Sequence, residues 1–312
     1  MKILHHQTPL YESTILSELT NKRILLKMEC FQPTGSFKIR GIGKLSSELV
    51  QKGHQQLVSS SGGNAGCAVA YAGRKLSVPV TVFVPTTTNP IFLKRLALEG
   101  AEIKIKGNVW DEAHQAAMEY VEKTQAGYVP PFDHPTLWAG HATMIDEVAQ
   151  QYDGEPPDAV VCAVGGGGLL CGVLEGLEKQ GWDKTAVFSV ETEGAASFAA
   201  SIKAGKLITL DRIQTIATSL GAKRVANKLF EWSQKKEITP LIVSDRDALS
   251  ACKHFIDDHR VLVEPACGAA LSIIYNQRHL SALKNAKSVL VIVCGGVGIS
   301  IDLLNQYLQT IK

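Results

Sequence analysis

Short apolar runs rich in β-branched residues alternate with longer amphipathic segments along the chain. The apolar runs lie at 24–29, 56–60, 80–84, 102–106, 159–164, 187–191 and 289–294. Several are apolar at nearly every position, which is typical of parallel strands covered on both faces, and segments such as 110–126 and 264–278 read as helices between them. The pattern predicts an α/β fold with a buried, mostly parallel sheet.

Turn-forming segments follow three of these strands, at 61–66, 165–168 and 295–298. Open α/β sheets bind their ligands at the carboxyl ends of their strands, so we expect the function to be concentrated in these turns. The length of 312 residues favours two compact units that share a cleft. Because the chain contains no internal repeat and no low-complexity linker, we expect the two units to be interwoven.

Charge and composition exclude several classes of function. Lys and Arg number 32 against 30 for Asp and Glu, and no basic stripe suits nucleic acid or an anionic membrane. No apolar run approaches a membrane span, and the first ten residues lack the apolar core of a signal peptide, so we expect a cytosolic protein. Seven cysteines without a CxxC pair suit a reducing compartment. The partner expected is a small molecule.

One lysine stands in a stretch that otherwise points inward. Lys38 lies between Phe37 and Ile39, directly after the turn-forming Pro-Thr-Gly-Ser of residues 33–36. A lysine at the start of a helix is usually solvated, and that interpretation stays open for the residue taken alone. In the alternative, apolar walls disfavour the charged amine, which leaves it free to attack a carbonyl and form a Schiff base.

Two glycine-rich turns are candidate anion sites. In "SSSGGNAG" (59–66), free N–H groups at a helix start, with the Ser61 and Asn64 side chains, suit a carboxylate, although a plain capped helix fits as well. In "VGGGGLL" (164–170), four successive glycines favour a phosphate cradle over a structural bend. The turn lacks the GK[ST] ending of a P-loop and the GxGxxG of a dinucleotide site, although Glu191 lies at a suitable distance for the latter.

A cysteine closes the last apolar strand. Cys294 precedes two glycines in "VIVCGGVG" (291–298). A buried cysteine usually packs like a small apolar residue. Its position at the carboxyl end of a strand also allows a polar role in a site.

Seven segments together resemble one family. "PTGSFKIRG", "SSSGGNAG", "GGGGL", "ETEGAASF", "SLGAK", "EPACGAA" and "VIVCGG" span nearly the whole chain and resemble the pyridoxal-phosphate enzymes of the tryptophan-synthase-β fold, within them the serine dehydratase and serine dehydratase-like group. The resemblance implies two open, mostly parallel twisted sheets, with the cofactor in the cleft between a large domain (1–37 and 138–312) and a small domain (38–137) that carries the substrate loop.

The same resemblance implies a role for each matched residue. Lys38 is expected to hold pyridoxal 5'-phosphate as a Schiff base and then to remove the Cα proton, with Phe37 and Ser219 on the two faces of the cofactor ring. Asn64 is expected at the ring hydroxyl and Cys294 at the pyridine nitrogen. The remaining carry-overs are Gly165, Gly166, Gly167, Gly168 and Leu169 for the phosphate, Ser61, Gly62, Asn64 and Ala65 for the substrate carboxylate, and Gly165, Glu191, Ala195, Leu220 and Ala222 for a monovalent cation such as K⁺.

The activity that the resemblance implies is β-elimination of L-serine to pyruvate and ammonia, and of L-threonine to 2-oxobutanoate and ammonia. Cys294 agrees with elimination, because a thiol is a poor partner for a protonated pyridine and disfavours a long-lived carbanion. The alternatives are a serine racemase, which would carry a serine in place of Gly62, a cysteine synthase-like enzyme, and a cofactor-binding protein without catalysis. A cytosolic homodimer is expected.

Overall fold

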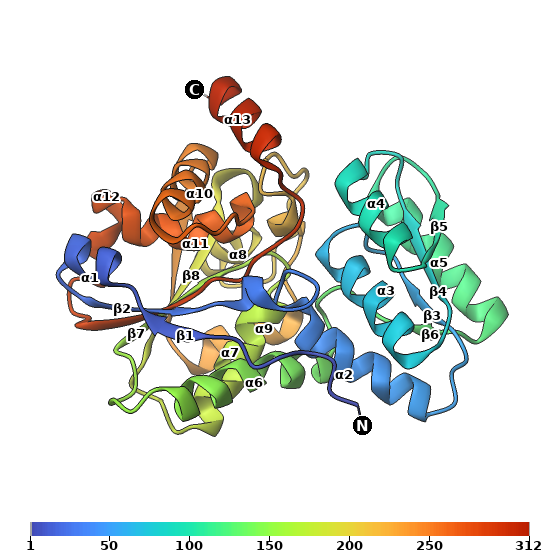
Figure 1. Ribbon diagram of the computed structural model, residues 1–312, viewed down its shortest axis with the longest axis horizontal. Coiled ribbons are helices and arrows are strands. Elements are labelled where there is room, and N and C mark those ends of the chain that lie inside the picture. Colours follow the sequence, from blue (N-terminus) through green and yellow to red (C-terminus); the bar gives the residue numbers. More distant parts are fainter. Residues whose placement is uncertain (1, 312) are drawn as a thin grey trace.

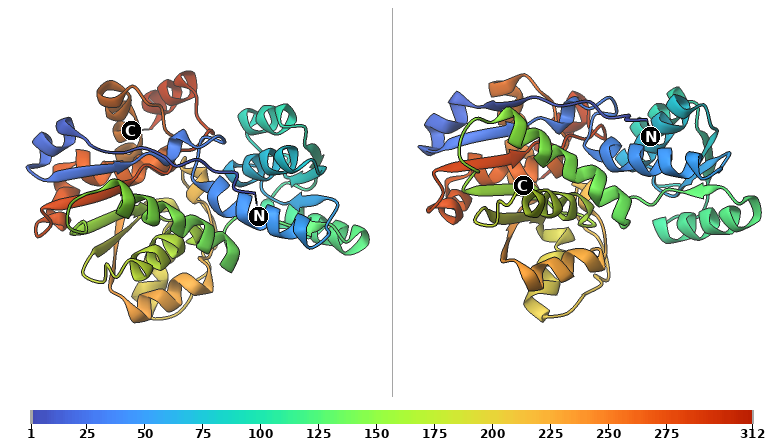
Figure 2. Two further views of the ribbon diagram at one scale, coloured as in Figure 1. Left: turned by 60° about the horizontal axis from the view of Figure 1, so that its bottom comes forward. Right: turned by 90° about the horizontal axis from the view of Figure 1, so that it is seen from below.

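Two separate sheets organise the chain (Figures 1 and 2). The computed structural model describes residues 2–311. The larger sheet has the order β1-β2-β10-β7-β8-β9, and only β1 runs antiparallel to its neighbour. Its strands are β1 (Leu10–Glu12), β2 (Arg23–Lys27), β7 (Ala159–Ala163), β8 (Ala186–Thr192), β9 (Ile238–Val243) and β10 (Ser288–Ile292).

The smaller sheet is entirely parallel, in the order β5-β4-β3-β6. Its strands are β3 (Leu57–Ser59), β4 (Val80–Val84), β5 (Glu102–Ile105) and β6 (Gly127–Tyr128). Figure 1 shows this sheet with α3, α4 and α5 as one lobe beside the lobe of the larger sheet. The expectation of two mostly parallel sheets flanked by helices is confirmed.

The helices largely follow the predicted pattern. They are α1 (Thr14–Thr20), α2 (Lys38–Gln51), α3 (Asn64–Leu76), α4 (Pro90–Leu98), α5 (Trp110–Thr124), α6 (Pro135–Gln151), α7 (Gly168–Lys179), α8 (Ser197–Ala204), α9 (Asn227–Lys235), α10 (Asp245–His259), α11 (Pro265–Tyr275), α12 (Gln277–Leu280) and α13 (Ile301–Thr310). Single 3₁₀ turns lie at Glu29–Phe31, Glu193–Ala195, Thr218–Leu220 and Ser281–Leu283. Proline at the first position of α4, α6 and α11 favours a helix start there.

The central strands are buried at every position, which explains their continuous apolar sequence. All five residues of β7 and of β4 are buried. One apolar core extends across both lobes, and a smaller cluster, Val58, Phe83, Ala113, Ala117 and Ala126, seats α5 on the outer face of the smaller sheet. The small side chains of Ala113 and Ala117 let α5 lie close to β3 and β4.

Three strands were not among the predicted runs. β1 has three residues and β6 two, too few to show a period. β9 carries Pro240, and only its two end residues, Ile238 and Val243, are buried, as expected of an edge strand, which needs no continuous apolar run.

A buried cluster of charges fixes the start of α2. Arg40 is fully buried, and its guanidinium reaches Glu29 at 2.6 Å and Glu147 at 2.7 Å. Lys27 Nζ donates to Glu147 at 2.6 Å. These four residues come from β2, the turn after it, α2 and α6. Because Arg40 lies two residues after Lys38, the cluster anchors the helix turn that carries the predicted catalytic amine.

Candidate active site

Lys38 is the first residue of α2, and its amine is poorly solvated. Its side chain is half-buried, Nζ donates to the carbonyl of Pro131 at 2.5 Å, and Nζ lies 5.2 Å from the centre of the Phe37 ring. Burial lowers the pKa of Lys38 to about 8, against the opposing influence of Cys294 and Glu264. About a tenth of the amine is therefore uncharged at pH 7, far more than for an ordinary lysine, and the uncharged form is the one that nucleophilic attack requires.

The segment after β10 holds the start of α2 in place. Phe37 N donates to the carbonyl of Cys294 at 3.2 Å, and Gly296 N donates to the carbonyl of Gly35 at 2.8 Å. Cys294 is buried, and a hydrogen bond with Cys267, together with burial, raises the pKa of its thiol well above the usual value. The structure thus brings Lys38, Phe37 and an uncharged thiol together.

Asn64 connects the smaller lobe to the larger one. Its amide nitrogen donates to Ser219 Oγ at 3.2 Å and to Glu264 Oε1 at 2.8 Å, and its amide oxygen accepts from Val297 N at 3.0 Å. All the polar atoms of the Asn64 side chain are thereby oriented. Residues predicted from distant motifs therefore meet in one place.

Glu264 is a site residue that the sequence analysis did not identify. It is buried at the start of α11, accepts a hydrogen bond from Gly298 N at 3.2 Å, and lies close enough to Lys38 to act on its charge. Burial raises the pKa of Glu264, although hydrogen bonds from Ser219, Gly298 and Asn64 act in the opposite direction. The available signal was an acidic residue directly before the proline of "EPACGAA", after the apolar "VLV".

The tetraglycine turn presents a row of free N–H groups. Within residues 2–311, no protein acceptor pairs with the backbone N–H groups of 165–169, at the start of α7. A side chain at these glycine positions would clash with neighbouring residues or require a strained backbone. A Cβ at Gly166 would lie 2.4 Å from the Phe132 ring, one at Gly168 would lie 2.6 Å from the Phe132 carbonyl oxygen, and Gly167 has a φ of 89°. Such a turn at a helix N-terminus suits a phosphate.

The substrate loop predicted at 61–65 leads into α3. Gly63 N donates to Ser61 Oγ at 3.4 Å, which gives the turn its shape. A Cβ at Gly62 would lie 2.7 Å from Thr88 Cγ2, so the Thr88 side chain occupies the space that a larger residue would need. Ala65 is buried in the first turn of the helix.

The residues predicted for a monovalent cation are only partly brought together. A Cβ at Gly165 would lie 2.9 Å from both Leu220 Cα and the Ser219 carbonyl oxygen, so these backbones are adjacent.

Glu191, the predicted side-chain ligand of the cation, is buried, and it accepts from Phe198 N at 2.8 Å and Ala199 N at 2.7 Å. Burial raises the pKa of Glu191 to about 7 despite these two bonds. Ala195 lies in the turn before α8, and Ala222 N donates to the Leu220 carbonyl at 2.8 Å. Cation binding stays a prediction.

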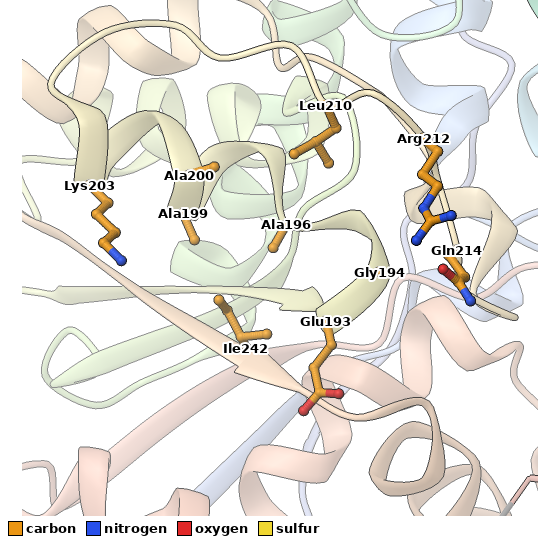
Figure 3. A pocket seen from close by; sticks show the side chains of 10 residues that line it. All are labelled: Glu193, Gly194, Ala196, Ala199, Ala200, Lys203, Leu210, Arg212, Gln214 and Ile242. Atoms are coloured by element: carbon orange, nitrogen blue, oxygen red, sulfur yellow. The ribbon is translucent and has the colours of Figure 1, made fainter.

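A cavity of about 450 Å³ lies over the turn 193–195 and α8, and Lys38 is not among the residues that line it (Figure 3). It contains none of the predicted site residues. Ala196, Ala199 and Ala200 form one wall, and Lys203 and Arg212 stand at opposite ends. The site is therefore defined by contacts among distant motifs and not by this cavity.

The fold and this constellation together define a pyridoxal-phosphate enzyme of the tryptophan-synthase-β type. Residues 2–295 match the family model described as pyridoxal-phosphate dependent enzyme. The chain belongs to this family.

Curated relatives align over nearly the whole chain. "Serine dehydratase-like" from Homo sapiens is 48% identical over 99% of this chain and 94% of its own length. "L-serine dehydratase" from Dictyostelium discoideum is 42% identical over 99% of this chain and 93% of its own length. "L-serine dehydratase/L-threonine deaminase" from Bos taurus is 45% identical over 96% of this chain and 93% of its own length.

Solved structures agree with these relatives. A fungal L-serine ammonia-lyase from Rhizomucor miehei superposes with a TM-score of 0.95, at 37% identity, over 100% of both chains. Threonine deaminase isoform 2 from Solanum lycopersicum gives a TM-score of 0.89 at 28% identity, over 98% of this chain and 83% of that one. No helix within residues 2–311 has the length and apolar character needed to span a membrane.

The residues present fit pyridoxal phosphate. An aldehyde needs an uncharged amine, and Lys38 has a lowered pKa. A phosphate needs several N–H donors, and the turn 165–169 has five without protein acceptors in the described chain. A pyridine nitrogen and a ring hydroxyl need hydrogen-bonding partners, which Cys294 and Asn64 can supply.

Proposed function

We propose that this protein is an ammonia-lyase that converts L-serine to pyruvate and ammonia, and L-threonine to 2-oxobutanoate and ammonia. The observation that carries the proposal is the Lys38 amine, which burial keeps partly uncharged near Cys294 and Glu264. The names of the full-length relatives support the same reaction. We further propose a cytosolic homodimer with a large domain at 1–37 and 138–312 and a small domain at 38–137.

We assign the following roles to the residues of this chain. The bound cofactor supplies a covalent attachment point for the substrate amine and a ring that withdraws electrons from Cα. Lys38 would hold the cofactor and then, as a free amine, take the Cα proton. The N–H groups of 165–169 would bind the cofactor phosphate. Asn64 and Cys294 would bind the polar atoms of the cofactor ring, and Phe37 and Ser219 would cover the two faces of that ring. The carbonyls of Gly165, Ala195, Leu220 and Ala222, with Glu191, would bind a monovalent cation.

The loop 61–65 would bind the substrate carboxylate through the free N–H groups at the start of α3. This orients the substrate so that Cα faces the Lys38 amine. Because Cys294 is an uncharged thiol, it does not keep a pyridine nitrogen protonated as a carboxylate would, which favours prompt loss of the β-hydroxyl. Glu264 would position Asn64 through the 2.8 Å bond.

Pyruvate release from L-serine by the purified, cofactor-loaded protein tests the proposal. We expect Lys38→Ala to abolish both pyruvate release and the visible absorbance of bound cofactor. Lys44→Ala is the matched control, since Lys44 lies on the same helix in a partly exposed pair with Glu48, and it should retain both. Serine-dependent pyruvate release by the Lys38→Ala variant would contradict the assignment.

Racemisation and cofactor binding without turnover are measured in the same experiment. Release of D-serine in place of pyruvate would indicate a racemase, and a yellow protein that releases neither product would indicate binding alone. We expect little racemisation, because Gly62 offers no acid on the second face of Cα.

A further inference from the structure

Three polar side chains form a closed triangle behind the substrate loop. Ser60 Oγ lies 2.9 Å from Tyr128 Oη and 3.2 Å from His114 Nδ1, and the last two atoms are 3.0 Å apart. Ser60 is fully buried directly after β3, Tyr128 ends β6, and His114 is on α5. The exposed indole of Trp110 stacks on the His114 ring at 4.8 Å and 6°. None of the roles assigned above involves these residues.

Ser60 contacts neighbouring elements, whereas the residues on either side of it shape the loop. Ser61 N donates to Ser59 Oγ at 3.4 Å, and Ser61 Oγ accepts from Gly63 N. The Ser60 hydroxyl instead contacts His114 of α5 and Tyr128 of β6. Ser60 is therefore the point at which the start of the loop is attached to the rest of its lobe.

Counting protons shows that the triangle needs a neutral histidine. When neutral His114 carries its proton on Nε2, both hydroxyl protons of Ser60 and Tyr128 find an acceptor. One of the two hydroxyls donates to Nδ1 of His114, and the other donates to the oxygen of the first hydroxyl. When Nδ1 carries a proton, three protons point into the triangle and one hydroxyl proton loses its acceptor. A buried donor without a partner is unfavourable. Burial lowers the pKa of His114, and the nearby Asp111 opposes this only in part, while burial raises the pKa of the Tyr128 phenol and keeps it protonated.

We propose that Ser60 is a positioning residue that fixes the substrate-carboxylate loop 61–65 through a triangle with Tyr128 and neutral His114. The proposal rests on the proposed function of that loop. It predicts that the loop loosens, and the substrate binds less tightly, when Ser60 loses its hydroxyl or when His114 takes up a proton. The Lys38 chemistry lies elsewhere and should continue.

Steady-state kinetics with L-serine separate these two effects. Ser60→Ala leaves the Tyr128–His114 bond in place and no polar atom unpartnered, so the lobe should fold. We expect its KM to rise about fivefold, the loss expected for one buried hydrogen bond, with kcat within twofold of the parent. Ser46→Ala, at an equally buried serine on α2, is the control and should leave KM unchanged. An unchanged KM in Ser60→Ala, or an equal rise in Ser46→Ala, would overturn the proposal.

The pH dependence supplies a readout that simple loss of packing would not change. In the parent, KM should rise as the pH falls from 7.5 to 5.5, because His114 is protonated below its ordinary value of 6.5. His114→Gln keeps an acceptor but does not titrate, so its KM at pH 7.5 should match the parent and the low-pH rise should be absent. A His114→Gln profile that follows the parent would show that another group causes the rise and would overturn the proposal.

Two measurements remain valid if the protein releases no pyruvate. Titration of the cofactor absorbance with L-serine gives a dissociation constant, which should rise about fivefold in Ser60→Ala. A protonated imidazole quenches a stacked indole, so the difference in fluorescence between the parent and Trp110→Phe should decrease with a midpoint below pH 6.5 and should not titrate in His114→Gln. Failure of these two measurements refutes the triangle, whereas absence of pyruvate refutes only the proposed reaction.

Discussion

Lys38 is destabilising where it stands, because its charged form is poorly solvated. Its native pKa of about 8 lies below the ordinary 10.5, so between these values the folded chain binds fewer protons than the unfolded chain. The stability of the cofactor-free protein should therefore rise with pH across that window, and the penalty is fully present below pH 8.

We predict that Lys38→Met stabilises the cofactor-free protein at pH 7 by about 1–3 kcal/mol, because it removes the poorly solvated charge. Urea denaturation measures the free energy of unfolding. The advantage over the parent should shrink between pH 8 and pH 10.5, whereas Lys44→Met, in a partly exposed pair, should change stability little at any pH. A Lys38→Met variant less stable than the parent at pH 7 would contradict the account.

At the same scale, the sequence pointed to some candidate site residues more readily than to others. Lys38 and Cys294 stand out because a charged residue or a thiol interrupts an apolar stretch next to glycines. Glu264 did not stand out, since a glutamate before a helix-starting proline is a common surface cap. Its function depends on contacts with Asn64 and Gly298, which come from distant parts of the chain. Such contacts leave no local pattern.

At the scale of elements, the loop before α3 packs closely against the segment that precedes α4. Gly62 has no side chain, and Thr88 fills the space beside it, with Cγ2 2.7 Å from where a Cβ would stand. The resemblance relates this position to alanine or serine in other branches of the family. The structure indicates that such a change requires a second one at Thr88.

We predict that Gly62→Ala alone lowers kcat/KM for L-serine about tenfold, because the new methyl group displaces either Thr88 or the loop. The double variant Gly62→Ala/Thr88→Ala should recover most of this loss, and Thr88→Ala alone should have the smaller effect. A double variant no better than Gly62→Ala would show that the space beside Thr88 is not what limits position 62.

Element by element, long buried strands could be predicted and short or edge strands could not. β4, β7, β8 and β10 coincide with apolar runs because both their faces are covered. β6 consists of Gly127 and Tyr128, and its place depends on pairing with Leu57 and Val58 of β3, 70 residues earlier in the sequence. The helix expected at 264–278 ends at Tyr275, where Asn276 caps the separate α12.

For the molecule as a whole, the buried charges around Arg40 connect parts of the chain that the sheets alone leave separate. Glu29 is fully buried and depends on Arg40 for its counter-charge. Burial acts to raise the pKa of Glu147, but the hydrogen bonds from Arg40 and Lys27 outweigh it and lower that pKa below the ordinary 4.5. Glu147 thus contributes stability that is present above pH 4.5 and lost as the pH falls through its lowered native pKa.

We predict that Arg40→Leu lowers the free energy of unfolding by about 3–5 kcal/mol, because it leaves the fully buried Glu29 carboxylate without its counter-charge. Arg40→Leu/Glu29→Gln should recover part of the loss, since it also removes the charge of the fully buried partner. The exposed Arg246→Leu is the control for losing a cation and should change stability little. A loss under 1 kcal/mol for Arg40→Leu would show that water reaches this cluster.

The overall arrangement of the lobes was less accessible from sequence. Apolar runs and glycine-rich turns indicated an α/β fold, but the order β1-β2-β10-β7 depends on which strands pair over distances of more than 250 residues. Both Ile24 and Ala159 are register partners of Val289. Nothing near 24 or 159 specifies that neighbour.

This strand order has a consequence for synthesis on the ribosome. The smaller sheet has all its strands once residue 128 has emerged, and it can assemble while translation continues. The larger sheet must wait for β10, at 288–292, with β2 and β7 exposing unsatisfied edges until then. Cys294, which we propose to contact the cofactor ring, follows directly, so we expect the nascent chain to bind its coenzyme only near the end of elongation. A stalled or shortened product would expose the unpaired edges of β2 and β7 to chaperones or aggregation.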